Sequence, residues 1–187
     1  MKKFIPFILL LFFFQVVDAQ KQKPKFTSIN QVGVAWGGSD QDLQLQTING
    51  IFYKTFSVGI GVALDYYWQR TVPVFIDLRK DLFTKDKTPF VYADLGANMP
   101  WIKANKEQTW YKSDYHRGSY FDIGIGYKMK VYKKFSANLS FGYTQKVLKE
   151  ERTSQVIMFD SFRYDENGLE NYKYTLRRFS VKAGLSF

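Results

Sequence analysis

The sequence predicts an all-β chain that folds as an eight-stranded, antiparallel, up-and-down β-barrel spanning a membrane. Three observations predict this class. Apolar and polar residues alternate with period two along segments of about ten to fourteen residues. The connections between these segments alternate in length along the chain. Polar faces rich in glycine and aspartate, with aromatic residues near the segment ends, suit a barrel whose apolar face points outward.

The composition limits the possible classes of site. The chain has 187 residues, no cysteine, one histidine and a formal net charge of +10. Without cysteine there is no disulfide framework, and a lone histidine with scattered carboxylates supplies no metal-ligand spacing, so we expect neither a metal nor another cofactor. The positive charge suggests nucleic acid as a partner. However, the chain lacks a run of five or six basic residues, and we expect it to be exported, so nucleic acid is excluded.

The first element is a predicted signal peptide at residues 1–19. Lys2 and Lys3 precede an apolar run at 4–14, and Val17-Asp18-Ala19 supplies small residues before a cleavage site. The alternative is a membrane anchor, but the run is shorter than the ~20 residues that a spanning helix needs. We therefore expect cleavage after Ala19 and a barrel domain over residues 20–187.

Eight strands follow from the alternation. They are predicted at residues 27–37, 43–53, 56–68, 74–83, 90–99, 119–130, 135–147 and 174–187. The clearest is 56–68, where one face carries apolar side chains such as Val58, Ile60 and Val62 and the other carries small or polar ones. A tilted membrane strand needs about 9–11 residues, so these lengths are sufficient to span a bilayer.

The connections are predicted to differ between the two ends. Those at one end are short: 54–55, 84–89 and 131–134. Those at the other end are 38–42, 69–73, 100–118 and 148–173, of which the last two are long. Outer-membrane barrels keep short turns on the periplasmic side and longer loops outside. Residues 156–159 are apolar enough to extend a strand above the membrane.

Aromatic residues are predicted to form a girdle at each membrane interface. One rim is expected to contain Trp36, Tyr66, Tyr67, Trp68 and Trp101. The other is expected to contain Phe52, Tyr53, Phe56, Phe83, Phe90, Tyr132, Phe135 and Phe187. Lys80 points toward lipid by its parity, and near the periplasmic end its ammonium group can reach the interface.

The polar faces are predicted to fill the lumen with ion pairs. The inward residues include five acids and five bases: Asp65, Asp77, Asp81, Asp94, Asp122, Arg79, Lys128, Lys146, Arg178 and Lys182. Eight strands enclose a space only wide enough for side chains, and charges confined there must be paired. We expect Arg79 and Lys182 among Asp77, Asp94 and Asp122; the alternative is a proton or ion path along these groups.

The chain ends on an aromatic residue of an apolar face: Phe179-x-Val181-x-Ala183-x-Leu185-x-Phe187. This segment resembles the C-terminal signal that barrel-assembly machinery reads in outer-membrane proteins. Together with 46–50, 58–67 and 72–79, it resembles the small outer-membrane β-barrel proteins of Bacteroidetes, the PorT-like or OmpA-like barrel domains. This resemblance extends over nearly the whole mature chain, and implies location in the outer membrane of a Gram-negative cell and assembly by that machinery.

The predicted outer loops hold the candidate surface contacts. Trp101, Trp110, Tyr111 and the single histidine, His116, lie among basic residues. Aromatic rings beside cations can stack on sugars or hold lipid phosphates, although such rings also serve as interface anchors. Ser113 and His116 are close in sequence, but no nucleophile elbow or oxyanion arrangement accompanies them.

The expected function is structural, surface-binding or secretion-accessory, without catalysis. Its partners are expected to be outer-membrane lipid, the assembly machinery and an unidentified surface ligand or secretion component. Two alternatives remain: an outer-membrane enzyme acting at the outer rim, and a soluble periplasmic barrel that binds a small apolar ligand.

Overall fold

The computed structural model describes residues 23–38, 40–101, 106–108, 111–158 and 161–187. The predicted signal peptide, residues 1–19, lies outside these ranges. Within them, no helix is long and apolar enough to cross a membrane.

The described residues form ten β-strands in a single antiparallel sheet. The strands are β1 Lys25–Gly37, β2 Asp40–Tyr53, β3 Phe56–Asp65, β4 Thr71–Asp81, β5 Lys87–Pro100, β6 Lys106–Gln108, β7 Tyr111–His116, β8 Gly118–Tyr132, β9 Phe135–Met158 and β10 Ser161–Ser186. Eight of them close a ring in the order β1-β2-β3-β4-β5-β8-β9-β10, and β10 pairs back onto β1. The eight-stranded up-and-down barrel predicted from the sequence is confirmed.

The end of the barrel with short connections is called the turn end. It holds the turn Lys54-Thr55, residues 82–86 and the turn Lys133-Lys134. Lys54 adopts a positive φ of 56°, which a two-residue turn between paired strands requires. The first and last strands meet here, where the Ser28 amide donates to the Phe187 carbonyl at 2.9 Å and the Phe187 amide donates to the Ser28 carbonyl at 3.0 Å.

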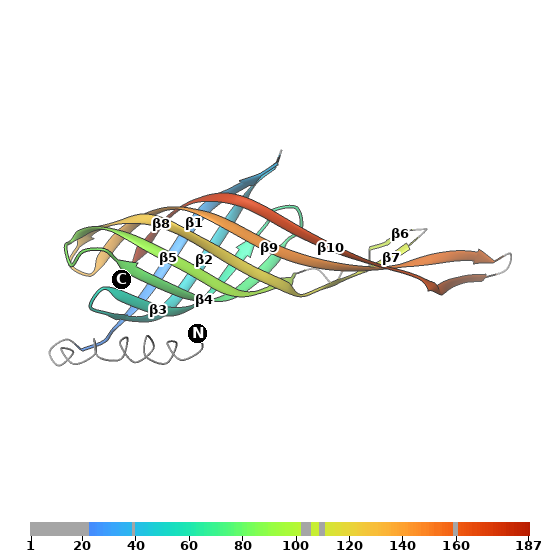
Figure 1. Ribbon diagram of the computed structural model, residues 1–187, viewed down its shortest axis with the longest axis horizontal. Coiled ribbons are helices and arrows are strands. Elements are labelled where there is room, and N and C mark those ends of the chain that lie inside the picture. The colour runs from blue at the N-terminus through green and yellow to red at the C-terminus, as the bar shows by residue number, and fades with distance from the viewer. Residues whose placement is uncertain (1–22, 39, 102–105, 109–110, 159–160) are drawn as a thin grey trace, which may run out of the picture.

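The opposite end carries a hairpin that continues beyond the barrel, and it is called the hairpin end. Here β9 and β10 remain paired up to Met158 and Ser161, and Figure 1 shows them projecting well past the ring. Strand β7 pairs with β9 from Tyr111↔Ser154 to His116↔Lys149, and β6 pairs with β7. The prediction of loops at 100–118 and 148–173 was therefore wrong for most of their length, because β7 and β10 satisfy the backbone of β9 on both sides. We call β6, β7 and the parts of β9 and β10 above the ring the hairpin sheet.

The apolar face of the ring points outward. Val58, Ile60 and Val62 on β3 are exposed over 54%, 66% and 41% of their surface, whereas Asp77 and Lys182 are 1% exposed. The other ring strands follow the same alternation. Because the ring is closed, no backbone group at its surface is left without a partner, which is the condition for strands to span lipid. The outward apolar side chains then face the acyl chains.

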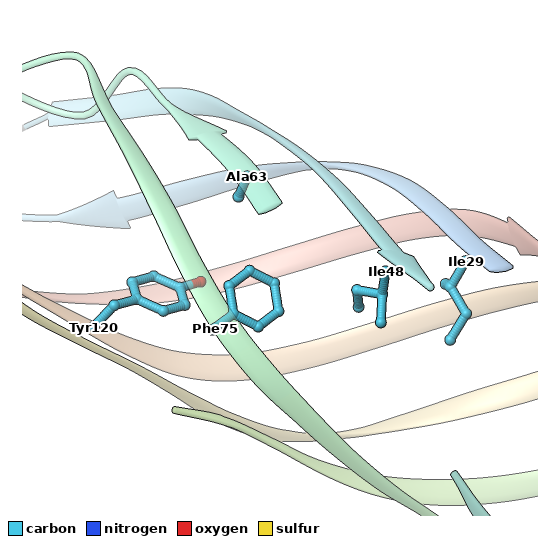
Figure 2. Packing of buried hydrophobic residues seen from close by; sticks show 5 residues of the cluster. All are labelled: Ile29, Ile48, Ala63, Phe75 and Tyr120. Atoms are coloured by element: carbon cyan, nitrogen blue, oxygen red, sulfur yellow. The ribbon is translucent and has the colours of Figure 1, made fainter. Parts of the chain in front are cut away.

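A small apolar cluster lies inside the ring. It contains Ile29, Ile48, Ala63, Phe75 and Tyr120, and Figure 2 shows the Phe75 and Tyr120 rings side by side. Their ring centroids are 5.4 Å apart. These residues occupy inward positions of their strands, so the lumen is filled by rings and aliphatic groups as well as by charges.

Three residues assigned to the aromatic girdles point inward instead. Phe90 is 3% exposed and Tyr67 is 8% exposed. Phe52 shares the inward parity of Ile48 on β2, and the Lys128 ammonium lies 4.8 Å from its ring centroid. Phe90 has the inward parity of β5, two residues before Tyr92. Strand β3 ends at Asp65, so the predicted strand 56–68 was too long. Tyr67 lies beyond that end, and the Tyr67 hydroxyl donates to the Gly37 carbonyl inside the ring. Trp68 then leaves the lumen with a positive φ of 58°.

Two inward glycines make room for the lumen rings. A Cβ atom on Gly61 would lie 2.2 Å from the Phe75 ring, and one on Gly126 would lie 2.3 Å from the Phe90 ring. Gly61 is the direct partner of Phe75 on the adjacent strand, and Gly126 is that of Phe90, so each ring can lie over its neighbouring strand because the glycine there has no side chain.

Candidate functional site

Three aspartates form a row on the inner wall. Asp77, Asp94 and Asp122 are directly opposed residues of β4, β5 and β8, and each is at most 1% exposed. Residues opposed in a sheet point to the same face at the same height. The ladder register therefore places three carboxyl groups side by side in the lumen.

Two cations reach this row from different strands. The Arg79 Nε donates to Asp77 Oδ2 at 2.8 Å, and the Lys182 Nζ donates to Asp122 Oδ2 at 2.7 Å. Both cations also contact aromatic faces: the Arg79 guanidinium lies 5.4 Å from the Tyr92 ring centroid, and the Lys182 ammonium lies 4.8 Å from the same centroid. Both cations thus contact the Tyr92 ring while each remains paired with its own aspartate.

Asp94 has no basic group within 4 Å among the described residues, unlike its two neighbours. Its Oδ2 accepts a hydrogen bond from Gln46 Nε2 at 2.9 Å, and Gln31 donates in turn to the Gln46 carbonyl oxygen. A chain of neutral amides thus joins β1 and β2 to the central aspartate on β5.

Tyrosine hydroxyls complete the row. Tyr92 donates to Asp122 Oδ1 at 2.9 Å, and Tyr120 donates to Asp122 Oδ2 at 3.2 Å. Gln44 donates to the Tyr120 hydroxyl at 3.1 Å across the ring, from β2 to β8. Asp122 therefore accepts three hydrogen bonds, which is what a buried carboxylate needs to remain in a dry interior.

A second cluster lies nearer the hairpin end, centred on Asp65. Arg178 Nη1 lies 2.7 Å from Asp65 Oδ2, and Lys146 Nζ donates to Asp65 Oδ1 at 3.1 Å. Lys146 also donates to the carbonyls of Tyr67 and Gln69 at 2.6 and 3.0 Å. One carboxylate on β3 thus holds two fully buried cations from β9 and β10.

A third pair closes the lumen toward the turn end, where the Lys128 ammonium donates to Asp81. The structure thus brings all ten inward charged residues into the lumen, nine of them in ion pairs and Asp94 in an amide hydrogen bond. The Lys146–Asp65 bond joins β9 to β3, and the Gln44–Tyr120 bond joins β2 to β8. Each pair of strands lies on opposite sides of the ring, so side chains block the lumen at those heights.

Sequence reasoning missed the neutral members of this network. Gln44, Gln46, Tyr92 and Tyr120 lie at inward positions two residues from another inward residue, so the strand parity alone could have found them. The sequence analysis gave them no role, because it considered only the charged residues of the inward faces. Buried carboxylates need hydrogen-bond donors, and that requirement could have identified them.

The candidate residues of the outer rim lie in different surroundings. His116 is on β7, where its Nε2 lies 3.1 Å from Glu151 Oε2 of β9. Trp101 is 54% exposed just after β5. Trp110 lies outside the described residues, as does the side chain of Tyr111.

Ser113 is 2% exposed and three positions from His116 on one strand, so the two side chains point to opposite faces. The described residues contain no group of three metal-ligating side chains.

A row of aromatic rings extends from the rim of the barrel at the hairpin end onto the hairpin sheet. The Trp68 and Tyr174 ring centroids are 4.6 Å apart, and the Tyr174 and Tyr172 centroids are 6.2 Å apart. The Arg152 guanidinium lies 4.7 Å from the Tyr172 centroid. Trp68 and Tyr172 are 48% and 37% exposed. We call Trp68, Tyr172, Tyr174 and Arg152 the aromatic ladder.

Glu150 fixes the top of this ladder. Its Oε1 accepts from Arg152 Nε at 2.8 Å, and its Oε2 accepts from the Tyr174 hydroxyl at 2.9 Å. Burial tends to raise the pKa of this carboxyl, but the hydrogen bonds from Arg152 and Tyr174 outweigh it, and the pKa is lowered from its ordinary value of 4.5. The ionised form of Glu150 therefore ties β9 to β10 above the ring.

Solved outer-membrane proteins share this architecture. Neisserial surface protein A aligns with a TM-score of 0.58 and 11% identity, covering 88% of this chain and 98% of that one. The N-terminal β-barrel domain of Pseudomonas aeruginosa OprF aligns with a TM-score of 0.53 and 12% identity, covering 88% and 100%. The outer-membrane protein AlkL, solved in lipid bilayers, aligns with a TM-score of 0.51 and 13% identity, covering 89% and 90%.

No family model matches the chain, and no curated protein matches it in sequence. Identities of 11–13% leave the fold as the shared property. The closed ring, its outward apolar face and these alignments lead to one conclusion: this chain has the fold of a small eight-stranded outer-membrane β-barrel.

Proposed function

We propose that the protein is an integral barrel of the outer membrane that conducts no solute and displays the hairpin sheet as a carbohydrate-binding surface. The aromatic ladder is the observation that carries this proposal. It presents exposed rings in sequence on a rigid sheet, with a guanidinium beside them. Rings stack on the apolar faces of sugars, and the guanidinium donates to hydroxyl or phosphate oxygens.

The predicted signal peptide, the fold and the resemblance to PorT-like and OmpA-like barrels of Bacteroidetes support this location. The short turns at the turn end favour a periplasmic position for that end and an exterior position for the hairpin sheet. Phe179, Val181 and Leu185 on β10, and Phe187 directly after it, point outward, where assembly machinery can read them before the barrel closes.

Membrane integration is tested by fractionation and gel mobility. We expect the protein to stay with the outer membrane after a carbonate wash and to shift in SDS gels only on boiling. Release by carbonate would favour the soluble periplasmic carrier instead.

Carbohydrate binding is tested with oligosaccharide released from the producing cell's own lipopolysaccharide. We expect W68A and Y172A each to weaken binding by about fivefold, because each loses ring stacking of about 1 kcal/mol. Y132A removes a more exposed ring at the turn end and is expected to bind as the wild type does. Equal binding by all three variants would contradict the proposal.

An enzyme at the outer rim is the alternative, and His116 would be its base. We propose that the chain is not an enzyme, because Ser113 and His116 occupy opposite faces of β7. H116A is therefore expected to leave any lipid or peptide turnover unchanged, and loss of turnover would favour the enzyme.

A further inference from the structure

The turn end contains a cavity that the functions considered so far do not use. Its volume is about 670 Å³, and it opens between the three short connections and the start of β1. Its wall includes Thr27, Phe52, Ser136 and Ser186, which lie near the turn-end termini of four strands. The paired Lys128 and Asp81 form part of its wall. The bonds that cross the ring fill the lumen farther in, so this cavity is a cup at the mouth of the barrel and not part of a channel.

Lysine dominates the walls of this cup: eight lysines and two aspartates lie among its described lining residues. Both aspartates are already occupied. Asp81 pairs with Lys128, and Asp86 accepts from Lys130 at 3.1 Å. The Lys54 ammonium lies 5.7 Å from the Tyr53 ring centroid.

The remaining lysines come from three separate segments. Lys23 and Lys25 lie at the start of β1, Lys85 lies between β4 and β5, and Lys133 and Lys134 form the turn between β8 and β9. None of the five has a carboxylate within 4 Å among the described residues. Connections far apart in sequence thus converge on one cavity with ammonium groups that lack a counter-charge.

Such a concentration of like charge is unfavourable unless an anion shares the space. The volume lies in the range of small-ligand sites, about 300–1,000 Å³, and is too small for a folded partner. No arginine lines the cup among the described residues. Lysine ammonium groups bind phosphate as point charges, so several of them around one cavity suit a compact anion with many oxygens.

We infer that this lysine cup is a binding site for phosphate groups at the periplasmic mouth of the barrel. Two sources supply this chemistry there: the headgroup of an anionic phospholipid in the inner leaflet, and a soluble oligophosphate. The hydroxyls of Thr27 and Ser136 offer further donors at its wall. The inference is independent of carbohydrate binding at the opposite end.

The test uses the mature chain in nanodiscs of neutral phosphatidylcholine, titrated with inorganic tripolyphosphate by calorimetry. We expect saturable binding that weakens as salt rises. The triple variant K85Q/K133Q/K134Q is expected to bind on the order of tenfold more weakly, because each exposed charge contact contributes only a few-fold. K149Q/K173Q/R177Q removes the same charge near the hairpin end and is expected to bind as the wild type does.

A second arm separates the two sources. In nanodiscs containing phosphatidylglycerol, a headgroup that occupies the cup would reduce the tripolyphosphate affinity of the wild type. It would also appear as retained lipid in native mass spectra, with more lipid on the wild type than on the triple variant K85Q/K133Q/K134Q. Unchanged affinity there would assign the cup to a soluble phosphate. Equal binding by the wild type and both triple variants, or equal competition by hexaglutamate, would overturn the inference.

Discussion

At the scale of single residues, the stability of the lumen depends on which carboxylate pairs with which cation. Asp65 holds both Lys146 and Arg178, and neither cation is exposed. Asp94 holds no cation and accepts from the Gln46 amide. Two aspartates with similar burial therefore contribute differently to stability.

Asparagine at these two positions separates the two roles. D65N leaves two buried cations without a carboxylate, so we expect a loss of about 3–5 kcal/mol in unfolding free energy. D94N preserves the shape and the oxygen that Gln46 contacts, so we expect a loss below about 1 kcal/mol. The measurement is urea unfolding in lipid vesicles, followed by the gel shift. Equal losses in the two variants would contradict the assigned pairing.

The contact between Gly61 and Phe75 supports a second prediction. G61A forces a methyl group against a ring that cannot move, because Tyr120 packs on it. We expect a cost of about 1–3 kcal/mol. F75L shortens the facing side chain, so G61A/F75L should be more stable than the sum of the single changes. Simple additivity in the same unfolding assay would show that the ring does not limit this position.

At the scale of elements, period two predicted all eight ring strands, but not their ends. The residues 148–173 carry mixed charges that suggested a solvated loop, and nothing local shows that β7 will return to pair with β9. That pairing is between residues far apart in sequence, such as His116 and Lys149, so no local pattern reveals it. Likewise Tyr67 and Phe90 resembled girdle residues, because an amphipathic or apolar ring serves equally well in a lumen and at an interface.

The hairpin sheet is predicted to loosen in acid. The pKa of Glu150 is lowered in the folded state, so the ionised carboxylate stabilises the sheet above the ordinary value of 4.5 and this contribution is lost as the pH falls through the lower folded value. We expect amide exchange in the part of β9 and β10 above the ring to rise as the pH falls below 4.5, relative to the ring strands.

The control for this prediction is the neighbouring carboxylate. E150Q should abolish the acid-dependent loosening, because the amide has no proton to gain. E151Q removes an equally charged but half-exposed group and should retain it. Identical pH profiles for E150Q and the wild type would show that another group controls the sheet.

At the scale of the whole molecule, the ring is a solid wall with a packed interior. Ion pairs and hydrogen bonds from β2, β3 and β10 reach β5, β8 and β9 across the lumen. Reconstitution in planar bilayers should therefore give no steady single-channel conductance, beside a porin measured as a positive control. Ohmic steps in the wild type would instead favour an ion path along the charged residues.

The chain contains no cysteine, so single cysteines report on the central feature of this account, the outward apolar face. A fluorophore on V58C, I60C or V62C in lipid vesicles should be quenched by brominated acyl chains and not by aqueous iodide. Quenching by iodide alone, or protection from both quenchers, would place these side chains in water or in an enclosed core and contradict the inverted polarity of the barrel.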